Sequence, residues 1–529
     1  MNYFWINTRE FGANKSMQLK KVLAIGVLSS FNWAYAAMPT SGAGIKPSLN
    51  NLSSFIESGT YTKVNLSENL GKFISESQAL SYKPDELYQY YRAKVCEGVY
   101  WFNCKANLKH IKQDTGIDFE QKSALIGHSF SQINAHRVIY TTLGMDNQAR
   151  KVSGAVLIPQ SSQPLKGVVI VYHVTVLNKE NVPSNFKLDG FNFSKNMASI
   201  LASDGYVVVM PDYLGMGVDE SAVHPYVIYP EVNALSGIYM LDSLKKIQPN
   251  LKFNLVKNQI PLYLTGYSEG GSYALWAAKI LQDNKSYLAK HGYYLTKTVP
   301  MEGVYNLSKV TLPFLVNNSA DKVKQAPFYL GDARIASFAK PGFVANVLNA
   351  YAHYDLHGNE SAVFSPAFAA CSGCKIGDKS YTVSALLQAS AGEKVKYSLI
   401  HDAASAIGYS NQNNSILSLT NPQLLDSSQF LTRLAAADIY NWKATTPISF
   451  LTMEYDSSVT RLNSETAYSA MSAQGSGSLS MKVIPNQNYK TKSYLPFMDM
   501  NIDHSDGLTF MLLFARNQFD ERSASVNSN

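Results

Sequence analysis

The chain has 529 residues, of which 46% are hydrophobic and 16% charged, and its formal net charge is +7. This is the composition of an ordinary globular protein, long enough for one large domain with insertions or for two domains. Runs of basic residues that could follow phosphates are missing from the sequence, so we do not expect a nucleic-acid partner.

The first 36 residues have the pattern of a secretory signal peptide. Three lysines precede the apolar run Val22–Leu28, and an Ala-Tyr-Ala pattern ends at Ala36. We therefore expect cleavage before Ala37, and Met17 is a plausible true start. Seven apolar residues are too few to span a bilayer, and no later segment reaches 18, so no integral membrane segment is expected after cleavage. The sequence predicts a secreted or periplasmic protein with a net charge of +4.

Residues 37–130 are polar, rich in Ser and Tyr, and weakly periodic, which predicts an irregular N-terminal extension with short helices around 84–96. The chain has four cysteines, and in an exported protein two local disulfides, Cys96–Cys104 and Cys371–Cys374, are the default. A redox motif at Cys371 would lack the usual βαβ setting, and zinc would need two further ligands. No metal is expected.

Residues 131–307 and 437–520 alternate between buried-type strands and amphipathic helices, which predicts a mostly parallel sheet covered by helices. The expected strands are 134–142, 151–159, 167–172, 206–210, the run from Leu262, 299–303, 446–452 and 479–484. The expected helices are 194–203, 232–247, 272–281, 463–473 and 507–518.

The run from Leu262 leads into Gly266-Tyr-Ser268-Glu-Gly270-Gly and then into a helix. This strand–turn–helix context is typical of a nucleophile elbow, in which a serine occupies a strained turn and small neighbours prevent clashes. We therefore predict Ser268 as a nucleophile. The alternative is a Gly-rich turn whose serine only caps the helix.

The alternation stops between 308 and 436, where helical patterns at 341–354, 383–391 and 394–406 predict an inserted helical cap or lid. Phe343, Val344 and Leu348 lie at helical spacing and are candidate substrate contacts, although they could equally form the ordinary core of the cap. Tyr267, next to the candidate nucleophile, is a further candidate substrate contact.

A serine nucleophile needs a histidine base that is oriented by a carboxylate, and in elbow-type folds both follow the serine in the order acid, then histidine. Asp456 follows a predicted buried strand, with Glu454 as its rival and a structural turn residue as the alternative role. The base is predicted to be His504, which is the only histidine after Asp456. His353, His357 and His401 precede the acid.

A tetrahedral intermediate also needs two N–H donors for its oxyanion. The first is predicted at Glu269, directly after the serine, and the second at Val174 or Thr175 in the loop after strand 167–172. Asp212 and His224 precede the elbow, and we interpret them as structural residues at the mouth of the pocket.

These motifs together resemble α/β-hydrolases of the secretory lipase (lipase A-like) family and its bacterial relatives. The resemblance covers roughly residues 134–518, including Val152–Pro159, the loop from Tyr172 to Ser184, Pro211–Gly217 with His224-Pro-Tyr226, and the elbow. It departs from the family in two places. Val174 stands where the family has glycine, and the interval from Asp456 to His504 is long, with an added loop near 486–494.

The resemblance implies the α/β-hydrolase fold, an esterase or lipase activity, a helical lid and no cofactor. The sequence thus predicts a secreted serine hydrolase that cleaves carboxylic esters of small molecules or lipids, with contact to lipid surfaces left open. A serine peptidase or acyl-peptide hydrolase on the same fold is the alternative enzyme. A binding protein that has kept the fold without activity is the alternative outside enzymes.

Overall fold

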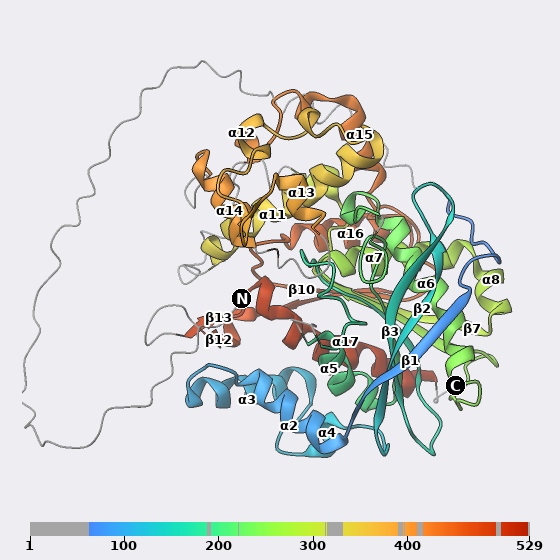
Figure 1. Cartoon of the computed structure of the whole chain (residues 1–529). Coiled ribbons are helices and arrows are strands. Elements are labelled where there is room, and N and C mark those ends of the chain that lie inside the picture. The colour runs from blue at the N-terminus through green and yellow to red at the C-terminus, as the bar shows by residue number, and fades with distance from the viewer. Residues whose placement is uncertain are drawn as a thin grey trace, which may run out of the picture. The chain divides into compact units, whose positions relative to one another are not determined.

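The computed structural model describes residues 63–187, 192–220, 222–312, 314, 332–389, 395, 397–409, 416–492 and 499–526. The predicted signal peptide lies outside these residues. A nine-stranded sheet forms the centre of the described chain (Figure 1). Its strands, in spatial order, are β1 (Phe73–Tyr82), β2 (Ile133–Leu143), β3 (Ala149–Pro159), β5 (Tyr206–Pro211), β4 (Gly167–Tyr172), β6 (Ile260–Tyr267), β7 (Tyr293–Met301), β10 (Ile448–Met453) and β11 (Leu479–Ile484).

The sheet is antiparallel from β1 to β5 and parallel from β5 to β11. Every residue of β4, β5 and β10 is buried, as expected for strands that are covered on both faces. The helices of this part of the chain are α2 (Pro84–Val95), α3 (Trp101–Thr115), α4 (Lys122–Leu125), α5 (Phe193–Ile200), α6 (Pro230–Ile247), α7 (Glu269–Asp283), α8 (Lys285–Lys290), α16 (Leu462–Ala473) and α17 (His504–Val526).

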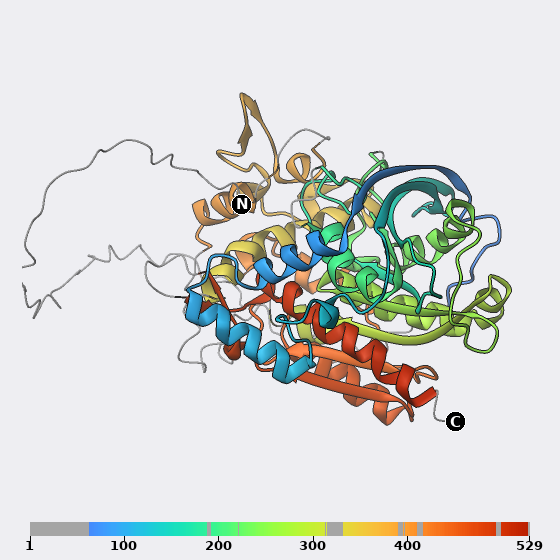
Figure 2. The ribbon, with the colours of Figure 1, turned by 90° about the horizontal axis from the view of Figure 1, so that it is seen from below.

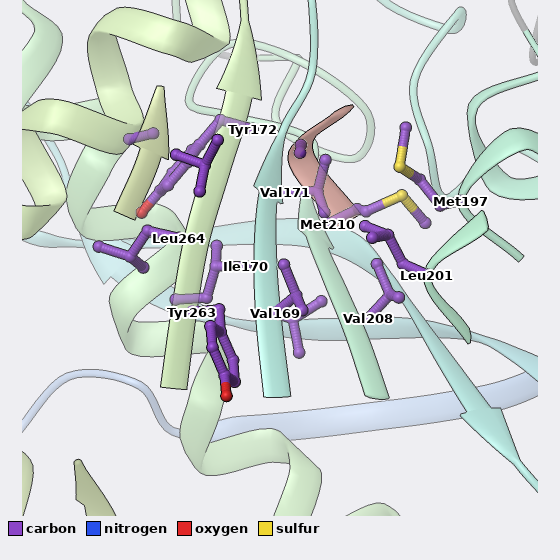
Figure 3. Packing of buried hydrophobic residues seen from close by; sticks show 14 of the residues in the cluster. Val169, Ile170, Val171, Tyr172, Met197, Leu201, Val208, Met210, Tyr263 and Leu264 are labelled. Carbon is purple, nitrogen blue, oxygen red and sulfur yellow. The ribbon is translucent and has the colours of Figure 1, made fainter. Parts of the chain in front are cut away.

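Helices α6 and α7 pack together on one face of the sheet, while α5 and α17 cover the other (Figure 1). Figure 3 shows the apolar side chains that fill the layer around β4, β5 and β6, including Val169, Val208 and Leu264. The predicted α/β-hydrolase fold, a mostly parallel sheet covered by helices, is confirmed.

The described part of the segment that we predicted to be irregular is ordered. It supplies the edge strand β1 and the helices α2 and α3, which lie beside α17 (Figure 2). Strand β1 exposes most of its side chains, so it lacks the apolar alternation that would have revealed it. The prediction of an irregular extension is corrected for residues 63–130, although the helix expected around 84–96 is present as α2.

Residues 308–436, which we call the inserted segment, connect β7 to β10, and their described part contains mainly helices (Figure 1). The α-helices in its described residues are α11 (Asp332–Asp355), α12 (Pro366–Ala369), α13 (Val383–Leu387), α14 (Tyr397–Ala406) and α15 (Ser428–Ala436), and β8 (Lys375–Ile376) pairs with β9 (Lys379–Ser380). These elements build a second apolar cluster. It also includes Leu177, Tyr226 and Leu307, which lie in the connections after β4, β5 and β7.

The loops after β4, β5 and β7 leave the carboxyl ends of neighbouring strands, which lie at one edge of the sheet. The inserted segment packs on these loops, and polar contacts strengthen the packing. Asn178 exchanges two hydrogen bonds with the backbone of Val395, and the Tyr229 hydroxyl donates to Asp355 over 2.9 Å. The inserted segment therefore lies at the edge of the sheet where the predicted nucleophile is located.

Candidate active site

Ser268 occupies the sharp turn between β6 and α7, with φ of 60° and ψ of −122°. The close packing of this turn explains its glycines. A Cβ atom at Gly266 would lie 2.2 Å from the carbonyl oxygen of Gly270, and one at Gly270 would lie 2.1 Å from that of Tyr172. The Ser268 amide also donates to the carbonyl of Met301 on β7 over 3.0 Å. The turn therefore has the strained, glycine-dependent geometry of a nucleophile elbow.

Three predicted residues meet at this turn. The Nε2 atom of His504 lies 2.7 Å from Ser268 Oγ, and its Nδ1 atom lies 2.6 Å from Asp456 Oδ2. Because Nδ1 faces a carboxylate, it carries the proton and donates it, which leaves Nε2 to accept the hydrogen bond of the serine hydroxyl. All three side chains are buried, and Ser268 is only 6% exposed. The chain thus brings a hydroxyl, an imidazole and a carboxylate into one hydrogen-bonded line.

The loop after β10 fixes the acid. The second oxygen of Asp456, Oδ1, accepts the amides of Ser458 and Val459 over 2.8 and 2.7 Å, which leaves Oδ2 for the imidazole. Glu454, the rival candidate, is half-buried nearer the strand, and its amide pairs with the carbonyl of Ile484. Asp456 is therefore the carboxylate that contacts His504.

Burial and charge oppose one another at His504. Burial alone would lower the pKa of the imidazole, but the Asp456 carboxylate outweighs it and holds the pKa of His504 above its ordinary value. The imidazolium form that appears when the base takes the serine proton is stabilised by the same carboxylate.

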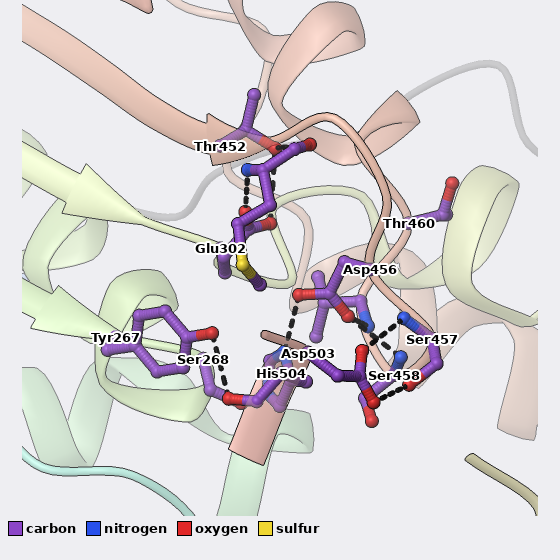
Figure 4. A network of polar contacts seen from close by, with 12 residues as sticks. Tyr267, Ser268, Glu302, Thr452, Asp456, Ser457, Ser458, Thr460, Asp503 and His504 are labelled. Atoms are coloured by element: carbon purple, nitrogen blue, oxygen red, sulfur yellow. Dashed lines mark hydrogen bonds and ion pairs between the residues drawn. The ribbon is translucent and has the colours of Figure 1, made fainter. Parts of the chain in front are cut away.

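Two further buried carboxyl groups surround the acid (Figure 4). Burial raises the pKa of Asp503 to about 6, and its carboxylate accepts the amide and hydroxyl of Ser457, the latter over 2.6 Å. Burial, followed by repulsion from Asp456, raises the pKa of Glu302 well above its usual range. Glu302 accepts bonds from the Thr452 hydroxyl and from the Met453 amide.

The loops that carry the acid and the base are joined by a side chain that the sequence analysis did not single out. Asn486 accepts the Tyr455 amide over 3.2 Å and donates to the carbonyls of Tyr455 and Ile502, each over 2.8 Å. It lies in the added loop near 486–494, so the unusual length of that interval was the available signal. A second contact holds the backbone of the base: the Tyr267 hydroxyl donates to the His504 carbonyl over 2.9 Å.

The predicted oxyanion donors lie close to the hydrogen-bonded residues Ser268, His504 and Asp456. Glu269 is the first residue of α7, so its amide is among those without a carbonyl partner inside the helix. The end of β4 touches the elbow, since a Cβ atom at Gly270 would meet the carbonyls of both Tyr172 and His173. Val174 and Thr175, the predicted second donors, follow directly.

The side chain of Glu269 is buried away from the reacting groups. It contacts His224 Nε2 and accepts the Tyr273 hydroxyl, each over 2.7 Å, while His224 Nδ1 lies 3.0 Å from the Leu214 carbonyl. Burial would raise the pKa of Glu269, but His224 outweighs burial and lowers it. Asp212 is also buried, and it accepts three hydrogen bonds from Ser153 and Ser184. These contacts agree with the structural roles predicted for His224 and Asp212.

The candidate substrate contacts differ in burial and in their neighbours. Tyr267 is 1% exposed and its hydroxyl is bonded to the His504 backbone, so it also positions the base, while its role in substrate contact stays a prediction. Val344 and Leu348 lie in the apolar cluster of the inserted segment, while Phe343 beside them is half-buried. A cavity lined by Val344 and Leu348 does not include Ser268 among its walls.

Both predicted disulfides, Cys96–Cys104 and Cys371–Cys374, are formed, which accounts for all four cysteines. Within the described ranges, no group of three or more His, Cys, Asp or Glu side chains is arranged to hold a metal ion. In the same ranges, no helix is both long and apolar enough to cross a membrane.

The chain is similar to one protein family and to several solved structures. The family described as secretory lipase matches residues 183–288, which include Asp212, His224 and the elbow. A putative hydrolase from Legionella pneumophila has a similar structure, with a TM-score of 0.57 and 17% identity over 85% of this chain and 98% of the other. The rice cell wall degrading esterase LipA from Xanthomonas oryzae has a TM-score of 0.57 and 18% identity over 85% and 99%.

At these identities the solved structures establish the fold. A search of curated protein sequences found no match. The resemblance to secretory lipases that the sequence predicted is confirmed.

Proposed function

We propose that this protein, a carboxylic ester hydrolase of the secretory-lipase type, cleaves its substrate through an acyl-enzyme on Ser268. The observation that carries the proposal is the line of hydrogen bonds from Ser268 through His504 to Asp456. A serine hydroxyl is a weak nucleophile at neutral pH, and an imidazole at 2.7 Å is placed to remove its proton during attack.

The reaction has two halves. Ser268 Oγ attacks the ester carbonyl while its proton passes to His504 Nε2, and the amide of Glu269, with that of Val174 or Thr175, holds the oxyanion. His504 then returns the proton to the departing alcohol, which leaves the acyl group on Ser268. Water attacks this acyl-enzyme by the same route, and the acid and the enzyme are released.

The inserted segment supports esters with apolar acyl chains as the substrate class. We assign it the role of a cap, because it packs on the loops at the carboxyl edge of the sheet and Ser268 is buried beneath that edge. Apolar cover of this kind favours an acyl chain over a charged peptide terminus. The two disulfides support export to an oxidising compartment, in line with the predicted signal peptide.

Labelling with a fluorophosphonate probe tests the mechanism. The wild-type protein should be labelled at Ser268, and Ser268→Ala should abolish both labelling and ester hydrolysis. His504→Ala should reduce turnover about as strongly, by roughly 10³-fold or more, because triad members act as a unit. Ser472→Ala, at an exposed serine on α16, is the matched control and should retain full activity. Wild-type turnover in either triad variant would exclude the assignment.

A further inference from the structure

The hairpin formed by α2 and α3 presents three consecutive aromatic side chains to solvent. Tyr100 is 39% exposed, Trp101 70% and Phe102 54%. The rings of Tyr100 and Phe102 stack at 5.6 Å, and Trp101 meets Phe102 edge-on at 6.1 Å. The three residues therefore form one continuous apolar surface, which we call the aromatic tip. An exposed apolar cluster of this kind is typical of an interaction site.

The aromatic tip is held firmly on the folded protein. The Cys96–Cys104 disulfide closes the hairpin around it. One turn further along α3, the Asn107 side chain donates to the carbonyls of Val95 and Lys490 over 3.1 and 3.0 Å, and it accepts the Lys490 amide over 2.8 Å. Large side chains that are pre-positioned in this way lose little conformational freedom when they bind.

These bonds also connect the tip to the candidate active site. Lys490 begins β12 (Lys490–Lys492), which pairs with β13 (Asp499–Asn501), and β13 ends three residues before His504 (Figure 1). The aromatic tip and the segment that carries the base therefore belong to one hydrogen-bonded framework. A surface bound at the tip is held at a fixed position relative to that segment.

The chain on either side of the tip carries mostly basic side chains. Residues 92–109 contain Arg92, Lys94, Lys105 and Lys109 but only one acidic residue, Glu97, which pairs with Lys94 over 2.7 Å. Arg92, Lys105 and Lys109 are exposed. Exposed tryptophan and tyrosine prefer the boundary between water and hydrocarbon, and neighbouring cations are attracted to anionic headgroups.

We propose that the aromatic tip is a docking surface for an anionic lipid–water interface. Two other occupants fit less well. A sugar ring stacks on an aromatic face, and Lys105 lies 4.8 Å above one face of the Trp101 ring. A second copy of the chain would bring like positive charges together. The biological purpose of docking rests on the proposed ester hydrolysis, whereas the binding itself does not require it.

Binding is measured by flotation with vesicles of phosphatidylcholine, alone or mixed with phosphatidylglycerol. All proteins carry Ser268→Ala, so that turnover does not alter the lipid. We expect the parent to float with the anionic vesicles, less so at high salt because exposed charges are screened. Trp101→Ser with Phe102→Ser should weaken binding about tenfold or more, since two large apolar side chains no longer leave water. Leu255→Ser with Leu462→Ser removes two exposed apolar side chains elsewhere and is the matched control.

Thermal melting verifies that each variant is folded, and if the double variant is not, Trp101→Ser and Phe102→Ser are compared singly. The proposal is overturned if the parent ignores anionic vesicles, or if the tip and control variants bind equally. It is also overturned if the tip residues are required for binding to insoluble polysaccharide but not to vesicles. Absence of ester hydrolysis in the protein with Ser268 restored would instead contradict the proposed function.

Discussion

His504 illustrates how single residues set the chemistry of this site. The imidazole is buried, which disfavours its charged form, yet a carboxylate at 2.6 Å more than compensates and raises its pKa. A base of this kind is neutral only above its raised pKa, so the enzyme should lose activity as the pH falls through that value. We therefore expect the acidic limb of kcat/KM to lie above pH 6.5, the ordinary pKa of histidine.

Replacing Asp456 by Asn tests this balance. The substitution removes the charge that raises the pKa of His504 but keeps its burial, so the acidic limb should move to lower pH. Turnover should also fall by about 10⁴-fold, because the amide no longer favours the productive tautomer. The measurement is kcat/KM on a water-soluble ester from pH 5 to pH 9. Glu454→Gln, at the rival carboxylate, is the control and should leave both the limb and the rate nearly unchanged.

The catalytic role of a residue could be predicted where its position in the sequence follows a known pattern, and not where it does not. The elbow has a defined sequence, and the acid and base follow it in order, so Ser268, Asp456 and His504 could be selected from the chain. Asp503 and Asn486 act through hydrogen bonds between loops that are far apart in sequence, and no periodicity marks such partners. The sequence did not show that Tyr267 also supports the base, because its place beside the serine does not reveal which way its side chain points.

At the scale of elements, the inserted segment is joined to the sheet by a pair of residues at its two ends. Ser308 follows β7, Asp438 precedes β10, and the carboxylate accepts the Ser308 amide over 3.1 Å and its hydroxyl over 2.5 Å. A further bond runs from the Ile439 amide to the Tyr305 carbonyl. Burial raises the pKa of Asp438 to about 7.

The pKa of Asp438 makes this junction sensitive to pH. The folded state holds the proton up to about pH 7, while the unfolded chain releases it near the ordinary value of 3.8, so folding is favoured at low pH. As the pH rises from about 4 to 7, this preference is lost and stability falls, by an amount on the order of 4 kcal/mol.

We expect Asp438→Asn to remove this dependence, because an amide accepts the Ser308 amide and cannot ionise. The variant should therefore gain melting temperature relative to wild type at pH 8, and much less at pH 5. Asp402→Asn, at an exposed aspartate of the inserted segment, is the control. An equal change in melting temperature at both pH values would show that the carboxyl group does not titrate in this window.

The elements differed in how well they could be predicted. Strands β4 and β11 have the predicted bounds, because each is a short run with clear ends. Strand β1 and helix α3 were missed, since β1 exposes most of its side chains and α3 presents aromatic residues to solvent instead of burying them. The feature that hid α3 from the sequence analysis is the one that we propose binds lipid.

At the scale of the whole described chain, the buried apolar side chains form two clusters. One fills the layers around the sheet, and the other lies within the inserted segment and includes Leu177, Tyr226 and Leu307 from the sheet's own loops. The sequence predicted an insertion between two parts of the sheet. It did not indicate which loops the insertion would contact. Those contacts depend on side chains from separate parts of the chain.

This arrangement predicts a preference for esters with apolar acyl chains. Each methylene that passes from water into apolar cover contributes about 0.8 kcal/mol, which corresponds to at most about a fourfold gain in kcat/KM. We expect kcat/KM on p-nitrophenyl esters to rise with acyl length until the covered space is filled, and p-nitroanilides with the same acyl groups to react far more slowly. Ser268→Ala provides the background rate. If the anilides are cleaved better than every ester, the peptidase alternative replaces the ester hydrolase, because an apolar cover alone would not favour the amide over the ester.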